Sequence, residues 1–388
     1  MIEPDPEMPS MVRAEVDLSA VRHNLTCVRK LCPHSRIMAM VKADAYGHGL
    51  VAIAGALGEA DGFAVARLQE ALRLRDSGIT QRILLLATLL DEAALQICSR
   101  RHIDVTAYDE SSVARIVAQA SLAPLRVWLK LDSGMHRLGL DPAAFAAADR
   151  LLSAHPGVLE LVHMTHFSNA KDERTREAQL VRFRSCRESS SKARVSLANS
   201  AALIASPETH ADWVRPGILL YGDNPVGARH PIPVRSAMRL RAQIIDLRRI
   251  GTGASVGYDG CWTSTRPSRI ATVGVGYGDG YPRHAQNGTP VWINGELAAL
   301  VGRVSMDSLA VDITDCGPVS VGDDVILWGP ELPAARVAEC AGTISYELFA
   351  SLTQRVHRVY AAQKPSRAVA GSDIHKSRQL CAVKPPNS

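Results

Sequence analysis

The stretch Ile37-Met38-Ala39-Met40-Val41 is a run of consecutive apolar residues, and Lys42 follows it directly. An uninterrupted apolar run of this length is typical of a parallel strand that is covered on both faces. Similar runs continue to residue 221: Phe63–Ala66, Ile83–Ala87, Asp104–Tyr108, Val127–Leu131, Leu159–Thr165, Val195–Ala198 and Ile218–Tyr221. The first part of the chain is therefore predicted to form eight parallel strands.

Helical patterns lie between most of these runs. Ser19–Leu31 begins with a serine, Asp91–Arg100 with an aspartate and Asp141–Leu152 with Asp-Pro, all of which favour a helix start. About eight strand–helix units predict an α/β fold with a (β/α)8 barrel of the TIM type. A doubly wound open sheet is the alternative. It would need fewer units and a glycine-rich first turn, and the sequence contains no G-x-G-x-x-G.

The pattern changes near Pro231–Pro233, where short strand-like runs and tight turns begin. Asn294-Gly295 lies between two such runs and predicts a hairpin. The runs are Pro290–Ile293, Leu297–Val301, Leu309–Ile313 and Val325–Trp328, and Ala334–Val356 has a helical pattern. The barrel is therefore expected over residues 12–231 and a mostly β domain over 232–360. Arg13–Leu18 alternates like a strand and could pair with either domain.

Composition limits the classes of function. The net charge of the chain is +5, but residues 364–388 carry five basic side chains against one acidic one, which leaves about +1 elsewhere. This is a poor footprint for nucleic acid. We expect a disordered N-terminus over 1–11 and a disordered basic tail over 361–388.

The chain also lacks features of a membrane or secreted protein. No apolar run is long enough to span a bilayer, and the first ten residues lack the basic and apolar regions of a secretory signal. A cytoplasmic location is therefore expected. The eight cysteines include no C-x-x-C pair, which favours reduced core thiols over disulfides, and no metal site is predicted.

Lys42 stands where the first strand of the barrel ends, in the segment VKADAYGHG over residues 41–49. Active sites of this fold lie at the carboxyl ends of the strands. Desolvation among apolar neighbours lowers the pKa of a lysine amine and makes it a Schiff-base former. The alternative is a surface lysine at a strand end.

The segment over residues 41–49 resembles the cofactor-lysine motif of the alanine racemases. The resemblance continues in the family's order over roughly residues 12–360. It runs through Lys130–Gly139, Thr165–Phe167, Ala198–Ala202, Val214–Ile218, Tyr221-Gly222, Val256–Tyr258, Gly276–Arg283, Gly302–Asp307 and Ile344–Glu347.

This resemblance implies a pyridoxal 5′-phosphate-dependent isomerase that interconverts L- and D-alanine, the latter for peptidoglycan. It also implies a homodimer with shared active sites. Lys42 would hold the cofactor and act as a base on one face of the substrate Cα, and Tyr258 would act on the opposite face. From its local sequence alone, Tyr258 could instead be a packed aromatic residue of the β domain.

The resemblance implies further contacts to the cofactor. Arg215 would hydrogen-bond the pyridine nitrogen, and His166 would support Arg215, although a histidine there could also be an ordinary core residue. The groups implied to bind the phosphate are Tyr46, Ser200, Tyr346 and the backbone N–H groups of Gly217 and Ile218.

Substrate contacts are implied in the same way. Arg137 and the backbone N–H of Met306 would meet the substrate carboxylate, and Lys130 matches a lysine that is often carbamylated and then holds Arg137. Asp172 is one residue further from His166 than the usual spacing, which puts its place at the substrate entrance in doubt. The residues implied at that entrance are Tyr277, Tyr346, Arg283 and Arg303.

Three alternatives share parts of this pattern. One is a racemase of broader specificity, acting on serine or lysine, which pocket volume would decide. Another is a non-catalytic pyridoxal-phosphate-binding barrel, a class without a β domain. A third is a decarboxylase of similar fold, which should lack the block Val256–Tyr258.

Overall fold

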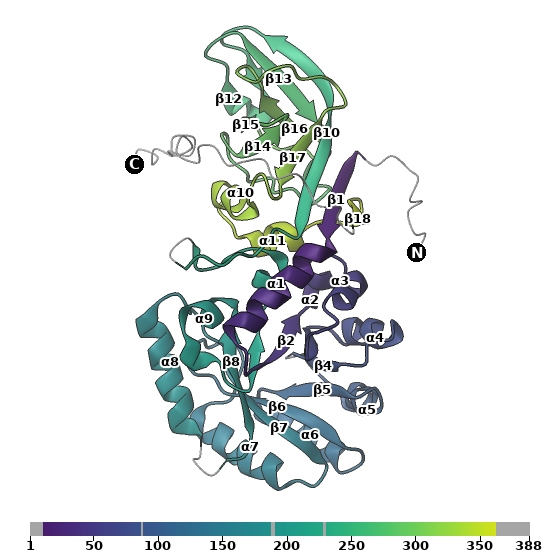
Figure 1. The fold of residues 1–388 in the computed structure, drawn as a ribbon, viewed down its shortest axis with the longest axis vertical. Coiled ribbons are helices and arrows are strands. Elements are labelled where there is room, and N and C mark those ends of the chain that lie inside the picture. The colour runs from purple at the N-terminus through teal and green to yellow at the C-terminus, as the bar shows by residue number, and fades with distance from the viewer. Residues whose placement is uncertain (1–10, 87, 188–190, 228–229, 362–388) are drawn as a thin grey trace. The chain divides into compact units, whose positions relative to one another are not determined.

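The structure is a computed structural model that describes residues 11–86, 88–187, 191–227 and 230–361 (Figure 1). The chain divides into two compact units. One is formed by residues 20–235 and the other by residue 236 onward together with the segment up to residue 19. We describe each unit by itself.

The first unit is a closed barrel of parallel strands surrounded by helices (Figure 1). Strand β9 pairs with β2, where Arg36 lies opposite Trp213, and this pairing closes the barrel. The strands are β2 Arg36–Met40, β3 Gly62–Val65, β4 Arg82–Leu85, β5 Ile103–Ala107, β6 Leu125–Lys130, β7 Val158–Met164, β8 Arg194–Asn199 and β9 Trp213–Arg215. Their apolar side chains are mostly buried, as the continuous runs predict, and the expected barrel is confirmed.

The eighth strand is not where the sequence predicted it. Ile218–Tyr221 forms the short 3-10 helix η2, and the strand is β9, three residues long, which ends before Pro216. All four residues of η2 are fully buried. An apolar run that is buried on every side looks the same in a strand and in a short helix, so periodicity could not separate the two.

The helix starts were predicted with mixed success. Asp91 and Asp141 accept hydrogen bonds from the backbone N–H groups of Ala94 and Ala144, at 2.8 and 2.9 Å, as N-caps do. Helix α1 instead begins at Leu18, and it is Asp17 that accepts from Ser19 N at 2.8 Å, so the predicted serine start is wrong.

The helices of the barrel unit vary in length. They are α1 Leu18–Leu31, α2 Lys42–Tyr46, α3 Leu50–Ala56, α4 Leu68–Asp76, α5 Glu92–Arg100, α6 Glu110–Ala120, α7 Pro142–Ala154, α8 Glu173–Cys186, α9 Ser200–Ala205 and the 3-10 helix η1 Pro207–Thr209.

The second unit contains an eight-stranded sheet in the order β13-β16-β15-β14-β17-β10-β1-β18. The strands are β1 Val12–Asp17, β10 Met238–Ile250, β13 Ser268–Val273, β14 Pro290–Ile293, β15 Glu296–Val301, β16 Leu309–Asp312, β17 Asp324–Trp328 and β18 His357–Ala361. Strand β1 pairs antiparallel with β10 and parallel with β18. We expected the barrel to begin at residue 12, and this is wrong for β1, which belongs to the sheet of the second unit.

The predicted hairpin is present between β14 and β15. Asn294 and Gly295 both have positive φ, 48° and 94°, as a two-residue type I′ turn requires. The helical stretch expected over residues 334–356 is two short helices, α10 Ala334–Cys340 and α11 Ser345–Ala350. Gly342, with φ 65°, lies between them in the left-handed conformation that ends helices.

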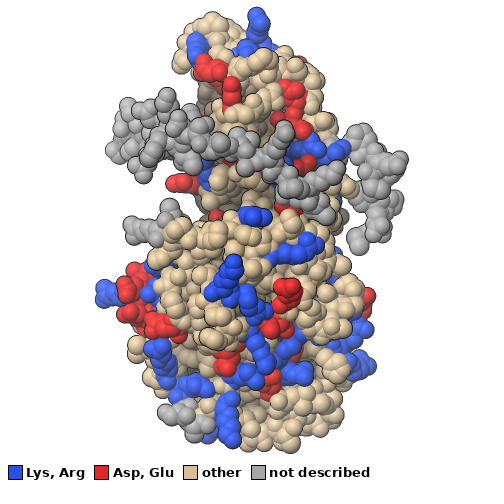
Figure 2. Space-filling view, in the orientation of Figure 1, with Lys and Arg blue, Asp and Glu red and all other residues tan. Residues whose placement is uncertain are grey.

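Some predictions fall beyond the described residues. The expected disordered N-terminus and tail lie outside them, apart from Met11 and Ala361. No described helix is long and apolar enough to cross a membrane. On the visible face of the barrel unit, acidic side chains are interspersed among basic ones, so that face presents no continuous basic stripe (Figure 2).

Candidate active site

Lys42 lies at the carboxyl end of β2, one residue beyond Val41. Burial lowers the pKa of its amine, and the positive charge of Arg137 lowers it further, while the carboxylate of Glu70 acts in the opposite direction. A lowered pKa increases the fraction of neutral amine, which is the form that can act as a nucleophile or a base.

The residues that follow Lys42 form a left-handed turn. Ala43, Asp44, Ala45 and Tyr46 have φ values from 51° to 55°, a conformation that costs roughly 1–2 kcal/mol for each non-glycine residue. Hydrogen bonds hold it in place: Ala45 N donates to Val41 O at 2.9 Å, and Leu50 N donates to the Asp44 carboxylate at 3.1 Å. The strained turn joins two predicted cofactor residues, Lys42 and Tyr46, and sets their separation.

Tyr46, Ser200 and Gly217 converge on one small region. The backbone N–H of Gly217 donates to Ser200 Oγ at 2.8 Å. A Cβ atom added at Gly217 would lie 2.5 Å from the Tyr46 hydroxyl, so only glycine permits this approach. Two hydroxyl groups and backbone N–H groups are the donors that a phosphate needs at close range.

The ring of Tyr46 is supported from behind by Tyr221. The two rings stack with their centroids 4.8 Å apart. Tyr221 is fully buried, and its hydroxyl donates to Met40 O in β2 at 2.9 Å. This contact ties the predicted phosphate region to the strand that precedes Lys42.

Arg215, at the end of β9, is buried and held by three hydrogen bonds. It donates to Ser196 Oγ at 2.6 Å, to Thr165 O at 2.6 Å and to Leu197 O at 3.2 Å. Burial lowers its pKa to about 10, which still leaves the guanidinium protonated at neutral pH. Its orientation is therefore fixed by β7, β8 and the residues that follow them.

His166 follows β7 and is neutral at physiological pH. Burial lowers its pKa to about 3, and the positive charges of Arg215, Arg137, Lys130 and Lys42 add to the effect. A neutral imidazole can lie among these cations without adding to their mutual repulsion. A neutral His166 can therefore lie beside Arg215 and support it, as predicted, without repelling its charge.

A carboxylate organises the loop that carries Arg137. One oxygen of Asp132 accepts from the backbone N–H groups of Gly134, Met135 and His136, at 3.0, 3.1 and 3.0 Å. In the same loop, Lys130 Nζ donates to Leu138 O at 2.6 Å. The Arg137 side chain therefore projects from a loop whose backbone is fixed at its base.

Lys130 is a second lysine with a perturbed amine. Burial lowers its pKa to about 8, with further lowering by Arg137 and Arg215 and an opposing effect of Asp132. A substantial part of the amine is then neutral at mildly alkaline pH, which is the form that reacts with carbon dioxide. Its carbamylation stays a prediction.

In the second unit, Tyr258 lies in the turn between the short strands β11 Ser255–Val256 and β12 Trp262–Thr263, on the 3-10 helix η4 Tyr258–Gly260. Its side chain is 64% exposed, and Met306 is 52% exposed. Gly278 N donates to Met306 O at 2.8 Å, which fixes the backbone at that position. Tyr346 lies on α11 and is half-buried.

The barrel brings its share of the predicted residues to one end. These residues lie at or just after the carboxyl ends of β2, β6, β7, β8 and β9, and Tyr46 lies beside Gly217. They are Lys42, Arg137, His166, Ser200, Arg215, Gly217 and Ile218. Sequence reasoning missed Thr165, Ser196 and Tyr221 as supports. Thr165 and Ser196 lie in the predicted runs that lead to His166 and Ser200, so their position alone could have suggested them.

Gln179 is a further support that the sequence did not suggest. It is buried on α8, accepts from Ser168 N at 2.9 Å and donates to Ser133 Oγ at 3.2 Å and His166 O at 3.3 Å. It therefore joins the loops after β6 and β7. The sequence of α8 has no clear apolar face, so nothing in it signals that Gln179 faces inward.

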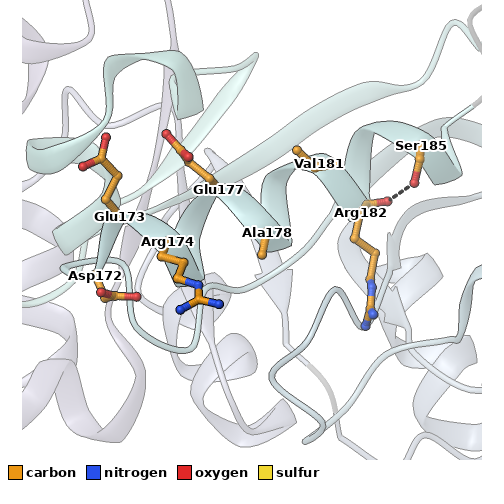
Figure 3. Close-up of a pocket in the computed structure, with 8 residues that line it drawn as sticks. All are labelled: Asp172, Glu173, Arg174, Glu177, Ala178, Val181, Arg182 and Ser185. Carbon is orange, nitrogen blue, oxygen red and sulfur yellow. Dashed lines mark hydrogen bonds between the residues drawn. The ribbon is translucent and has the colours of Figure 1, made fainter.

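A surface depression of about 950 Å³ lies along α8 and includes none of the predicted site residues (Figure 3). Its lining comes from this helix and from Asp172, which precedes it. Asp172 caps α8 by accepting from Thr175 N at 2.8 Å. Asp172 is thus engaged in capping a helix, in agreement with the spacing that made its place at the substrate entrance doubtful.

Comparisons with known proteins agree over both units. Residues 16–225 match the family described as "Alanine racemase, N-terminal domain", and residues 237–360 match "Alanine racemase, C-terminal domain". The biosynthetic alanine racemase of Pseudomonas aeruginosa is 46% identical over 354 residues, covering 90% of this chain and 98% of that protein. An alanine racemase of Yersinia pestis is 42% identical over 355 residues, covering 90% and 99%.

Solved structures give the same result. The crystal structure of the biosynthetic enzyme from Pseudomonas aeruginosa superposes with a TM-score of 0.88 at 44% identity, covering 91% of this chain and 100% of that chain. The alanine racemase from Bartonella henselae, crystallised with covalently bound pyridoxal phosphate, superposes with a TM-score of 0.85 at 31% identity and the same coverage. With both domains matched in order, this chain belongs to the alanine racemase family.

Proposed function

We propose that this protein is an isomerase that interconverts L- and D-alanine with pyridoxal 5′-phosphate bound at Lys42. The observation that carries the proposal is the convergence in the barrel unit of a lysine with a lowered pKa and a cradle of phosphate donors. Relatives 42–46% identical over nearly their whole length are named alanine racemases, which supports the substrate.

The residues present fit this cofactor. The hydroxyl groups of Tyr46 and Ser200 and the backbone N–H groups of Gly217 and Ile218 would hold the phosphate, with Tyr346 as a further contact implied by family resemblance. When bound, the conjugated ring of the cofactor stabilises the electron pair that remains on Cα after a proton is removed. The close approach of Gly217 to the Tyr46 hydroxyl, which a Cβ atom would meet at 2.5 Å, supports a cradle for a small anion at this place.

Arg215 would donate to the pyridine nitrogen. A guanidinium keeps its proton at neutral pH even with a pKa of about 10, so the ring nitrogen that accepts from it stays unprotonated. This weakens the ring as an electron sink and limits side reactions. Because Ser196, Thr165 and Leu197 fix the guanidinium, its direction is set before the cofactor binds.

Two residues would move the proton. Lys42 acts on one face of the substrate Cα, and its lowered pKa leaves it able to accept a proton near neutral pH. Tyr258 acts on the opposite face and delivers a proton there, which inverts the configuration. Arg137 and the backbone N–H of Met306 would hold the substrate carboxylate and so orient Cα between the two bases.

We also propose a two-fold homodimer in which each site combines Lys42 of one subunit with Tyr258 of its partner. The support is the exposure of large apolar and aromatic side chains on the second unit. Tyr258 is among them, and a phenol that acts as a base needs shielding from water. They are Tyr258 at 64%, Ile344 at 59%, Met306 at 52% and Tyr277 at 38% exposed. A contiguous apolar surface marks an interaction site, and we propose that these four residues contribute to one that the partner subunit covers.

The biological setting is part of the same proposal. The product D-alanine would enter peptidoglycan, and the enzyme would work in the cytoplasm. Cys27, Cys32 and Cys98 are buried free thiols, as expected in a reducing compartment.

Racemisation assays on a panel of L-amino acids test the activity. We expect D-alanine to form fastest, because only a small side chain is implied by the family. Faster racemisation of serine or lysine would instead identify a racemase of broader specificity. No racemisation of any amino acid by the cofactor-loaded protein would overturn the proposal.

Borohydride reduction tests the residue that holds the cofactor. We expect mass spectrometry to find the reduced cofactor on the peptide containing Lys42, and none after Lys42→Ala. Lys130 is the matched control, since it is another buried lysine with a lowered pKa. Label on Lys130 in place of Lys42 would reject the assignment.

A further inference from the structure

The turn that carries Tyr258 has little structure of its own to hold it. Strands β11 and β12 share two residue pairs, extended by the hydrogen bonds Gly253 N to Ser264 O at 2.8 Å and Ser264 N to Ala254 O at 2.9 Å, and a two-stranded ladder of this length is marginal in water. Within the turn, Gly257, Asp259 and Gly260 have positive φ values of 76°, 60° and 56°. The direction of the Tyr258 side chain must therefore be set by contacts from outside the turn.

Asn287 makes such contacts with both of its amide atoms. Its Nδ2 donates to Cys261 O at 2.9 Å, at the end of the turn. Its Oδ1 accepts from the backbone N–H of Gly302 at 2.7 Å. One side chain thus connects the turn of Tyr258 to the segment at Gly302.

Gly302 in turn touches the beginning of the same turn. It has φ 77°, and a Cβ atom added there would lie 2.7 Å from Val256 O. The backbone of Gly302 therefore packs directly on the residue that precedes Gly257. Asn287 holds Cys261 on one side and, through Gly302, supports Val256 on the other.

An ion pair joins the same two segments but is a weaker support. Asp259 Oδ2 lies 3.0 Å from Arg303 Nε, and the two side chains are 69% and 45% exposed. Exposed pairs of this kind contribute little because water screens them. Asn287 is also exposed, but its two hydrogen bonds reach backbone atoms of two segments at once, which makes them the more specific link.

We propose that Asn287 is a positioning residue, which holds the turn of Tyr258 so that the phenol meets the substrate Cα in a fixed direction. The inference rests on the proposed role of Tyr258 as one of the two bases. Misplacement of a reacting group by about 1 Å can cost on the order of a hundredfold in rate. A side chain that makes no contact with substrate can thus control the rate of one proton transfer.

Kinetics can separate this role from a general loss of structure. Asn287→Ala is expected to lower kcat roughly tenfold, as the loss of two hydrogen bonds implies. The fraction of cofactor bound at Lys42, measured by visible absorbance, should not change, because the cofactor residues of the barrel unit are not altered.

The decisive readout is the isotope effect of deuterium at Cα, measured separately with L- and D-alanine. For the enantiomer from which Tyr258 removes the proton, a slower transfer by Tyr258 becomes more rate-limiting. The isotope effect on kcat/KM for this enantiomer therefore rises. For the other enantiomer Lys42 removes the deuterium, and its isotope effect falls. A variant that only contains less folded enzyme changes neither.

Two further variants sharpen the test. Asn287→Asp can still accept from Gly302 N, but it places a carboxylate oxygen where Nδ2 donates to Cys261 O, and the two oxygens repel, so its isotope effects should move in the same directions. It also carries the test if Asn287→Ala does not fold. Gln286→Ala, at the exposed neighbouring residue, is the matched control and should behave as the wild type.

The outcomes distinguish the inference from the function on which it rests. Unchanged isotope effects in Asn287→Ala and Asn287→Asp, with Tyr258→Phe inactive, would overturn the positioning role alone. An active Tyr258→Phe enzyme would overturn the role of Tyr258 and the positioning role with it. Opposite shifts of the two isotope effects, with Tyr258→Phe inactive, are the expected result.

Discussion

Gly217 shows how a single residue can be required by a close approach. The reason is the Tyr46 hydroxyl, which leaves no room for a Cβ atom. The sequence marked Gly217 as a cofactor residue by resemblance, but the neighbour that excludes a side chain is visible only in the fold.

Gly217→Ala is expected to weaken binding of pyridoxal phosphate by roughly tenfold or more, because the new methyl displaces the hydroxyl of Tyr46. The Tyr46 side chain can move, so the melting temperature should change little. Equilibrium dialysis measures the affinity. Gly55→Ala is the control, since a Cβ atom there meets nothing within 4 Å, and equal affinities for the two variants would contradict this account of Gly217.

His166 should make the folded protein sensitive to acid. In the unfolded chain it binds a proton near its ordinary pKa of 6.5, but in the folded protein only near 3. Stability therefore falls as pH decreases from 6.5 toward 3 and is unaffected by this group above that range. Between pH 6.5 and 4.5 the free energy of unfolding should fall in both proteins, but in His166→Gln the fall should be smaller than in the wild type by on the order of 2 kcal/mol. Parallel pH curves from urea unfolding would refute this.

At the scale of elements, the sequence predicts what depends on pattern. Seven of the eight barrel strands were expected near their observed positions because continuous apolar runs mark buried parallel strands. Pattern failed at Ile218–Tyr221 and at the left-handed turn over residues 43–46. Ala43 and Ala45 have no local preference for positive φ, so their conformation is imposed by the surrounding contacts.

Arg75, on α4, illustrates a joint between elements that no motif predicted. Its guanidinium donates to Ile79 O, Gln81 O, Arg101 O and His102 O at 2.7–2.9 Å. It therefore joins the loop before β4 to the loop before β5 at the amino ends of these strands. A lysine, which keeps the positive charge, cannot replace the planar guanidinium that reaches four carbonyl groups.

Arg75→Lys is expected to lower the free energy of unfolding by about 1–2 kcal/mol, because a lysine amine cannot reach all four carbonyl groups, and the part-buried ones of Ile79 and Gln81 would lose a donor. Activity per folded molecule should be unchanged, since the joint lies at the opposite end of the barrel from Lys42. Urea unfolding measures the loss. Arg100→Lys, at an exposed position, serves as control, and equal stability of the two variants would show that the four bonds contribute nothing.

At the scale of the whole molecule, the proposed catalytic groups are divided between two units. Lys42 and the proposed phosphate cradle belong to the barrel, whereas Tyr258 and Met306 lie exposed on the β unit. Tyr258 and Met306 were predicted only through family resemblance, because nothing in a local pattern distinguishes a base from a packed tyrosine. Lys42 was also marked by its place at the end of the first barrel strand. The central claim is that a complete site combines Lys42 of one subunit with Tyr258 of its partner.

Refolding two inactive variants together tests that claim most directly. Lys42→Ala and Tyr258→Phe subunits are unfolded, mixed in equal amounts and refolded. Random assortment makes about half of the dimers mixed, and each mixed dimer has one site with both lesions and one site with neither. We predict that roughly a quarter of the wild-type activity returns. If mixed dimers form and no activity returns, Lys42 and Tyr258 act within one chain and the claim is contradicted.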